Sequence, residues 1–377
     1  MKLVRVSAVA RKEFIHIVRD PRSLGMAIAI PMLLLFLFGY ALALDVDRVP
    51  LMVWDQSQTP ASREFLTYFT GSRYFSLQRY ATGYPEIERA MDTREALVGL
   101  VIPRDFAARA HALAPVRVQA IVDGSDSNTA TIAMGYLNAI SLVYSNNVLL
   151  EHTRRITGKS PVPPVDFRPR VWFNADLESR NYIIPGLIAV IMMVIAALLT
   201  SLTVAKEWEQ GTMEQLISTP VKGPELVVGK LLPYFALGML DVLLAVLMGA
   251  FVFDVPLRGS VPLLFGVSAM FLSGALSMGI LISIVARSQL LASQLAMILT
   301  FLPSFLLSGF MYATGNMPRA VQAVTYLVPA RYFVALLKGI YLKGVGLEVL
   351  GIHAGLLAAF SAAMLALAIA KFKKRLD

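Results

Sequence analysis

Long apolar runs are the feature that most restricts what this chain can fold into. A helix rises 1.5 Å per residue, so about 20 residues are needed to cross a hydrocarbon core of ~30 Å. Six runs of that length carry at most one acidic, basic or histidine side chain: 24–44, 181–205, 231–253, 261–286, 288–318 and 349–370. With 56% hydrophobic and only 16% charged residues, the chain is not a disordered one. The sequence predicts an α-helical integral membrane protein with six transmembrane helices.

The basic residues beside these runs predict the orientation. Short segments on one side hold fourteen Lys or Arg residues: Lys2, Arg5, Arg11, Lys12, Arg19, Arg22, Lys206, Lys222, Lys230, Arg287, Lys371, Lys373, Lys374 and Arg375. The opposite side holds five: Arg258, Arg319, Arg331, Lys338 and Lys343. Because cytoplasmic flanks are enriched in Lys and Arg, both termini are predicted to be cytoplasmic. The first run lacks a clear small-x-small cleavage site before Asp45, so we expect a retained span and not a signal peptide.

Residues 45–180 change from a membrane pattern to a soluble one. β-rich runs such as 49–54, 74–80, 96–102 and 116–122 alternate with helical segments, and a returning strand is expected at 165–173. This alternation is typical of a small α/β domain, which the orientation places outside the cytoplasm. Its basic and acidic residues balance, so the net charge of +9 belongs to the membrane half. That distribution favours contact with anionic lipid and argues against nucleic acid as a partner.

Neither a metal site nor a nucleotide site is predicted. The stretch Asp123–Asn128 resembles part of a calcium loop, but Met134 stands where the closing glutamate belongs, so a turn followed by a helix cap is favoured. The segment Gly223–Leu231 has one residue too many for a phosphate-binding loop, and Gly158–Ser160 has no first glycine. We therefore expect no catalytic residues and no cofactor in this chain. If ATP drives it, another subunit binds the nucleotide.

Residues 1–23 have the pattern of an amphipathic helix lying in the membrane interface. Leu3, Val6, Ala10, Phe14 and Ile17 fall on one helical stripe, and basic residues surround it. The residues expected to carry this role are Arg11, Lys12, Phe14 and Arg19. The alternative is a plain positively charged anchor.

The loop 206–230 between the second and third spans carries the signals of a short docking helix. Gly211 breaks the preceding helix, Thr212 restarts it and Pro220 ends it. Apolar residues at i, i+3 and i+4 are how a short helix binds a partner's groove, and three glutamates add negative charge. The predicted coupling residues are Glu207, Glu209, Gly211, Thr212, Met213, Glu214, Leu216 and Ile217. The alternative is a solvated loop.

Two further features belong to the membrane half. Asp241 lies inside the third span, where a carboxylate is costly and marks either a transport pathway or a hydrogen-bonded structural site. The segment 309–343 stays apolar but is broken by Gly and Pro, which indicates an outer re-entrant segment sheltered by protein.

Several of these motifs together resemble a known family. They are Arg19-Asp20-Pro21-Arg22, the motif Glu-Trp-Glu-Gln-Gly-Thr-Met-Glu-Gln-Leu from Glu207, Leu-Ser-Gly-Phe-Met-Tyr from Leu307, and Pro-Ala-Arg-Tyr-Phe from Pro329. With the large domain after the first span, the chain resembles a permease of the ABC type-two exporter class. The likeness is strongest to bacterial multidrug-efflux permeases, and it covers essentially the whole chain.

The resemblance implies a half-transporter in the bacterial inner membrane that pairs with a second copy or with a similar permease. It implies a cytoplasmic ABC ATPase, with ATP and magnesium, docked on the coupling loop and on the N-terminal segment. A periplasmic adaptor and an outer-membrane channel are common companions of the long-domain branch. Two other functions stay open on the residues alone: an ion- or proton-driven antiporter using Asp241, and a membrane-anchored sensor in which residues 45–180 bind a ligand.

Overall fold

The computed structural model describes residues 2–42, 47–158, 170, 172–174 and 178–372, without the side chains of residues 22, 23, 26, 214, 216 and 217. The chain divides into two compact units, Met1–Leu44 with Arg170–Asp377, and Asp45–Pro169. We call them the helical unit and the inserted unit. The strand expected at 165–173 lies mostly outside the described residues.

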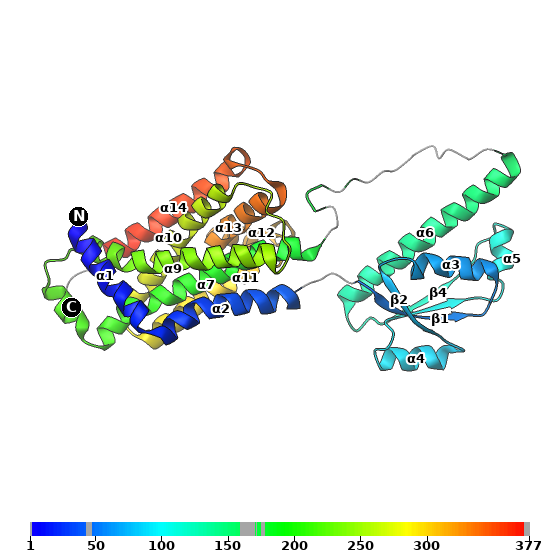
Figure 1. The fold of residues 1–377 in the computed structure, drawn as a ribbon, viewed down its shortest axis with the longest axis horizontal. Coiled ribbons are helices and arrows are strands. Elements are labelled where there is room, and N and C mark those ends of the chain that lie inside the picture. The colour runs from blue at the N-terminus through cyan, green and yellow to red at the C-terminus, as the bar shows by residue number, and fades with distance from the viewer. Residues whose placement is uncertain (1, 43–46, 159–169, 171, 175–177, 373–377) are drawn as a thin grey trace. The chain divides into compact units, whose positions relative to one another are not determined.

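The inserted unit is a four-stranded sheet with helices on both faces (Figure 1). The strands are β1 (Val49–Asp55), β2 (Phe75–Tyr80), β3 (Val98–Ile102) and β4 (Gln119–Val122), in the order β2-β1-β3-β4. β1 is parallel to β2 and β3, and β4 is antiparallel to β3. The helices are α3 (Pro60–Thr70), α4 (Tyr84–Asp92), α5 (Phe106–His111) and α6 (Ser127–Thr157). The parallel pairs need helical crossovers, which α3 and α4 supply.

Two apolar clusters hold this unit together. Phe65 and Tyr144, from α3 and α6, pack with Phe75 of β2, whereas Ile87 of α4 packs with Met52 of β1. The stretch 123–128 forms a turn and a cap: the Asp126 carboxylate caps α6 by accepting from the backbone N–H of Asn128. Hydrogen bonds from the Thr129 hydroxyl and that N–H lower the pKa of Asp126, as expected for a cap held in its charged form.

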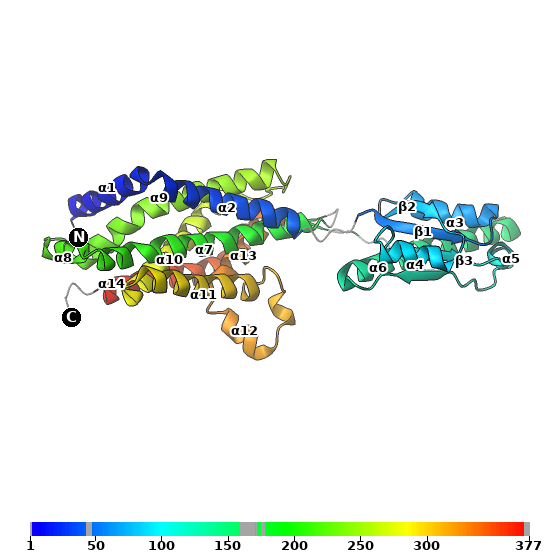
Figure 2. The same cartoon turned by 90° about the horizontal axis from the view of Figure 1, so that it is seen from below.

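The helical unit is a bundle around α7 (Ser179–Glu209), as Figure 2 shows. Helix α7 contacts α2 (Pro21–Ala41), α9 (Gly223–Phe251), α10 (Val261–Ala286) and α11 (Gln289–Leu307), and α14 (Leu347–Lys371) packs on α10. Among the described residues, five helices are long and apolar enough to cross a membrane, namely α7, α9, α10, α11 and α14. The first expected span coincides with α2, whose apolar stretch is shorter, Ala27–Ala41.

Helices α7 and α10 approach closely through small residues. A Cβ atom on Gly279 of α10 would lie 2.1 Å from the Thr200 hydroxyl oxygen and 2.4 Å from the Ala197 carbonyl oxygen of α7. The Ser283 hydroxyl of α10 accepts hydrogen bonds from the backbone N–H groups of Val204 (3.0 Å) and Ala205 (2.9 Å). Lipid tails are as apolar as leucine, so the hydrophobic effect does not drive helices together inside a membrane. Close packing and interhelical hydrogen bonds of this kind stabilise their association instead.

The chain between α11 and α14 is broken into short helices. They are η1 (Thr314–Asn316), α12 (Arg319–Thr325), α13 (Pro329–Lys338) and the π-helical η2 (Gly339–Lys343), and the chain bends by 85° between α12 and α13. The Lys338 ammonium donates to the Gly309 carbonyl oxygen (2.9 Å) and lies 3.3 Å from the centre of the Tyr182 ring. This cation therefore ties the broken segment to α7, a contact that the sequence pattern did not suggest.

Replacing Gly279 with alanine tests the α7–α10 contact. The added methyl group has no room, so we expect Gly279→Ala to lower the free energy of unfolding by about 1–3 kcal/mol, the usual cost of overpacking. The matched control is Gly266→Ala on the same helix, where a Cβ meets nothing within 4 Å. Thermal unfolding of the purified protein in detergent measures both, and equal melting temperatures for the two variants would refute this account of the contact.

Candidate functional site

The candidate site lies at the end of the helical unit that carries both termini and the short helix α8 (Thr212–Ser218), which is labelled in Figure 2. We call it the α8 end. It is built by α1 (Leu3–Arg19), α8 and the adjoining ends of α7 and α9. These elements contain both segments that the sequence analysis selected for coupling.

Helix α1 docks along the start of α9. Val6 and Val9 are buried, and a Cβ on Gly229 of α9 would lie 2.7 Å from the Val9 Cβ. The backbone N–H of Lys2 donates to the Glu225 carboxylate (2.7 Å), and the Arg5 guanidinium lies 3.6 Å from it. Only a residue without a side chain permits so close an approach, so Gly229 fixes where α1 sits.

The predicted apolar stripe of α1 is divided between two faces. Val6 is buried against α9, whereas Leu3 (78% exposed) and Phe14 (56% exposed) point outward with Val4, Ile15 and Val18. Arg11 and Arg19 are exposed as well. The helical spacing of Leu3, Val6 and Phe14 predicts one membrane-facing stripe and does not predict the second side of α1, which faces the protein.

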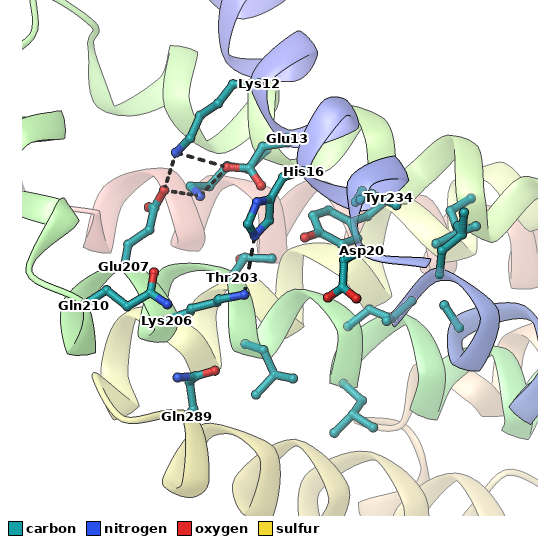
Figure 3. A pocket seen from close by; sticks show the side chains of 18 of the residues that line it. Lys12, Glu13, His16, Asp20, Thr203, Lys206, Glu207, Gln210, Tyr234 and Gln289 are labelled. Carbon is teal, nitrogen blue, oxygen red and sulfur yellow. Dashed lines mark hydrogen bonds and ion pairs between the residues drawn. The ribbon is translucent and has the colours of Figure 1, made fainter. Parts of the chain in front are cut away.

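A cluster of two lysines and two glutamates joins α1 to α7 and α9 (Figure 3). The Lys230 ammonium of α9 lies 2.8 Å from Glu13 Oε1 of α1 and 2.9 Å from Glu207 Oε1 of α7. The Lys12 ammonium lies 2.9 Å from the same Glu207 oxygen. Lys230, Glu13 and Glu207 are only 1%, 5% and 7% exposed. We call these four residues the ion cluster.

The charges of the ion cluster balance, which makes its burial tolerable. An isolated buried charge is very costly, and a buried pair is offset only when its geometry and hydrogen bonding are good. Partial burial alone would lower the pKa of Lys12, but the hydrogen bond and charge of Glu207, helped by Glu13, raise it above its usual value. Lys12 therefore stays protonated at physiological pH.

The Glu207 side chain lies inside the bundle and not on its surface. Glu207 was expected on an acidic docking surface with Glu209 and Glu214, but its carboxylate is buried and is paired with two lysines. Glu209 is exposed and accepts hydrogen bonds from the backbone N–H (2.8 Å) and side-chain amide of Gln289. The side chain of Glu214 is outside the described set.

Helix α8 has the expected start and end, but one of its apolar residues points inward. Gly211 has a left-handed backbone (φ +69°) that ends α7 and lets α8 begin at Thr212, as only glycine does readily. The Thr212 hydroxyl donates to the Glu207 carbonyl oxygen (3.3 Å). Met213 is buried in an internal cluster with Leu226 and Phe372, so it anchors α8 to its own bundle and not to a partner. The side chains of Leu216 and Ile217 are not among those described.

A cavity of about 780 Å³ opens at the α8 end between α1, α2, α7 and α9. The ion cluster forms part of its wall, as Figure 3 shows. Such a volume lies in the range of pockets for drug-sized molecules. This cavity could not be predicted from the sequence, because its walls come from segments nearly 300 residues apart in the chain.

Asp241 is buried in α9, at 1% exposure, away from this cavity. Its Oδ1 atom accepts no hydrogen bond from any residue that the structure describes. A structural role for Asp241 would require a serine or threonine hydroxyl that donates a hydrogen bond to this oxygen. No such bond is found among the described residues.

Comparison with known proteins decides which class of membrane protein this is. A family model described as ABC-2 family transporter protein matches residues 21–370. The chain belongs to the ABC-2 transporter family. It is 41% identical over 376 residues to the probable multidrug ABC transporter permease YbhS of Escherichia coli K12, covering 99% of this chain and 98% of that one. It is also 28% identical over 345 residues to the probable multidrug ABC transporter permease YbhR, covering 92% of each chain. For the inner membrane transport permease YhhJ of the same strain the identity is 27% over 335 residues, covering 87% and 86%.

The resemblance drawn from the motifs is thus confirmed, and this ABC-2 protein is a multi-pass transport permease. Membership of an ABC transporter family implies a partner ATPase and a pair of permeases. Neither the antiporter nor the sensor is favoured by these relatives.

Removing one charge from the ion cluster tests how much it stabilises the permease. In Glu13→Gln the buried Lys230 loses one of its two carboxylate partners, so we expect the free energy of unfolding to fall by about 3 kcal/mol. The matched control is Glu151→Gln, which removes an exposed i,i+4 pair with Arg155 and should change little. Denaturant unfolding in detergent measures both variants, and similar stabilities for the two would contradict a structural role of the cluster.

Proposed function

We propose that this ABC-2 permease is the membrane half of an ATP-driven exporter that moves amphipathic, drug-like molecules out of the cytoplasm or the inner membrane. The observation that carries the proposal is the 41% identity, over 99% of the chain, to a protein named a probable multidrug ABC transporter permease. A drug-sized cavity at the α8 end is in keeping with it.

In this proposal the permease crosses the bacterial inner membrane six times, with α2 as the first span. The α8 end and both termini face the cytoplasm, in accord with the fourteen basic residues that flank these span ends. The inserted unit then lies in the periplasm, where an adaptor leading to an outer-membrane channel is its proposed partner. The bent segment from α12 to η2 is the proposed outer re-entrant element.

The partner ATPase, which binds ATP and magnesium, docks on α8 in this proposal. Gln215 and Ser218 are exposed on α8 and are the contacts we propose, together with Glu209. The outward apolar side chains of α1 suit the membrane interface, where the exposed Arg11 and Arg19 would meet anionic lipid head groups. The second half of the transporter is another copy of this chain or a similar permease.

A single cysteine on α8 tests the coupling. The natural chain has no cysteine, so the variant Ser218→Cys contains a single thiol, on α8. In a complex with the partner ATPase, reconstituted in proteoliposomes, we expect ATP-dependent export of a fluorescent amphipathic drug. Modification of Ser218→Cys with a bulky maleimide before assembly should bring the drug-stimulated ATPase rate down to the basal rate, because it blocks docking.

The control is Gln78→Cys, an exposed site in the inserted unit, where the same modification should leave the stimulated rate intact. Full stimulation after modification at Ser218→Cys would refute docking on α8. Export that continues without ATP but requires an ion gradient would refute the proposed function and favour the antiporter that uses Asp241.

A further inference from the structure

Helix α6 of the inserted unit is apolar on two opposite sides. On one side Leu137 and Tyr144 are buried in the cluster that α6 forms with the sheet and α3, beside which it lies in Figure 1. The Asn147 side-chain amide donates a hydrogen bond to the Tyr68 hydroxyl of α3 (3.0 Å). Each residue turns a helix by about 100°, so Leu142 lies about 160° around α6 from Tyr144. That outer side exposes three large apolar side chains: Leu142 (62% exposed), Leu149 (53%) and Ile156 (71%).

The outer side of α6 has the spacing of a coiled coil. Its residues alternate in steps of four and three along three heptads: Gly135, Ala139, Leu142, Asn146, Leu149, Thr153 and Ile156. We call these seven residues the α6 seam. Helices that pair in a coiled coil meet through positions a and d of such a repeat. Here the leucines occupy d and Asn146 occupies the central a position, so the pattern indicates that the occupant of this surface is another helix.

The positions beside the seam favour an identical helix as the partner. Unlike helices are selected by opposite charges at positions e and g. In the α6 seam these positions hold no Asp, Glu, Lys or Arg residue between 135 and 156, and Val143 and Leu150 at e extend its apolar surface. The charged residues Glu151, Arg154 and Arg155 fall at f, b and c, away from the seam. Two copies of α6 can therefore meet without repulsion between like charges.

Asn146 strengthens the case for a pair of identical helices. In a parallel pair each a position faces its own counterpart, so the two Asn146 side chains would meet. A side-chain amide offers both donors and an acceptor, which lets two such groups hydrogen-bond to each other. A single asparagine at an a position is a known device for fixing the register of two strands at some cost in stability.

We propose that the α6 seam packs against the α6 seam of a second copy of this chain, as a parallel pair in matching register. The inference rests on the pairing of two permeases in the proposed function and deepens it, because it names a contact between the inserted units. Three heptads interrupted by Gly135, Asn146 and Thr153 make a weak seam. Pairing of the membrane halves offsets this weakness, since tethered sites meet at a high effective concentration.

Single cysteines on α6 test the contact in the full chain. The natural chain has no cysteine, so Leu142→Cys and Leu149→Cys each contain one thiol. Each variant would be reconstituted in proteoliposomes at low protein density and oxidised with copper phenanthroline, and the covalent dimer measured on non-reducing gels. Equivalent d positions face each other in a parallel pair. Both variants should therefore form the disulfide at least about tenfold faster than a thiol outside the seam, because the pair holds their thiols together.

The matched control outside the seam is Glu151→Cys, which is exposed on α6 at position f. Equal rates at the three positions would show random collision and overturn the proposal. A disulfide at only one of the two seam positions would overturn the parallel register. Thiols at both seam positions that stay unpaired and react with maleimide would overturn pairing with a second copy, and this is the result expected if the seam binds an adaptor helix instead.

A charge in the seam tests the position of Asn146. Adding Asn146→Asp to the Leu142→Cys variant would bring two carboxylates together, so we expect the rate of disulfide formation to fall about tenfold. The control is Asn147→Asp in the same variant, because its carboxylate lies beside the Tyr68 hydroxyl and can accept a hydrogen bond from it. An equal rate in both double variants would overturn the central place of Asn146.

These measurements are independent of export, since neither the ATPase nor a drug is present. Absence of the disulfides leaves ATP-driven export standing, and failure of export leaves the disulfides intact.

Discussion

The attraction of Lys230 for Glu13 and Glu207 is the contact on which the α8 end depends. These three buried residues, with Lys12, join α1, α7 and α9 through distances of 2.8–2.9 Å. A single buried charge on any one of these helices would be strongly destabilising without its partners. The opposite charges on the neighbouring helices therefore fix the relative positions of all three. Together with the close approach of α1 to Gly229, this contact holds α1 against α7 and α9, and it forms part of the cavity wall.

The rest of the bundle is suited to passing on a movement that starts there. Helix α7 runs from the ion cluster at Glu207 through the close contact at Gly279 to Tyr182, over which Lys338 sits. Closely packed helices move as rigid bodies, since packed cores do not deform continuously. A displacement of α1 by a partner would therefore reach α7 and α9 through the ion cluster.

Much of this architecture could be predicted because it depends on local pattern. Apolar runs give the spans, Gly211 and Pro220 delimit α8, and alternating strands and helices give the inserted unit.

The ion cluster could not be predicted, because Glu13 and Lys230 are 217 positions apart and a lysine at the start of an apolar run is usually a membrane anchor. One signal was present: Glu13 follows Val6 and Val9 at helical spacing, on the face that is buried. The inward turn of Met213 likewise depends on neighbours distant in sequence.

The most direct test of the central claim is a charge exchange within the ion cluster, read as drug molecules exported per ATP hydrolysed in reconstituted complexes. Glu13→Lys or Lys230→Glu alone leaves three like charges in the cluster, whereas the double variant restores two of each sign. If the cluster couples α1 to the spans, both single variants should hydrolyse ATP with little export, and the double variant should recover most of the export per ATP. Single variants that fold and export as efficiently as the natural protein would contradict the claim.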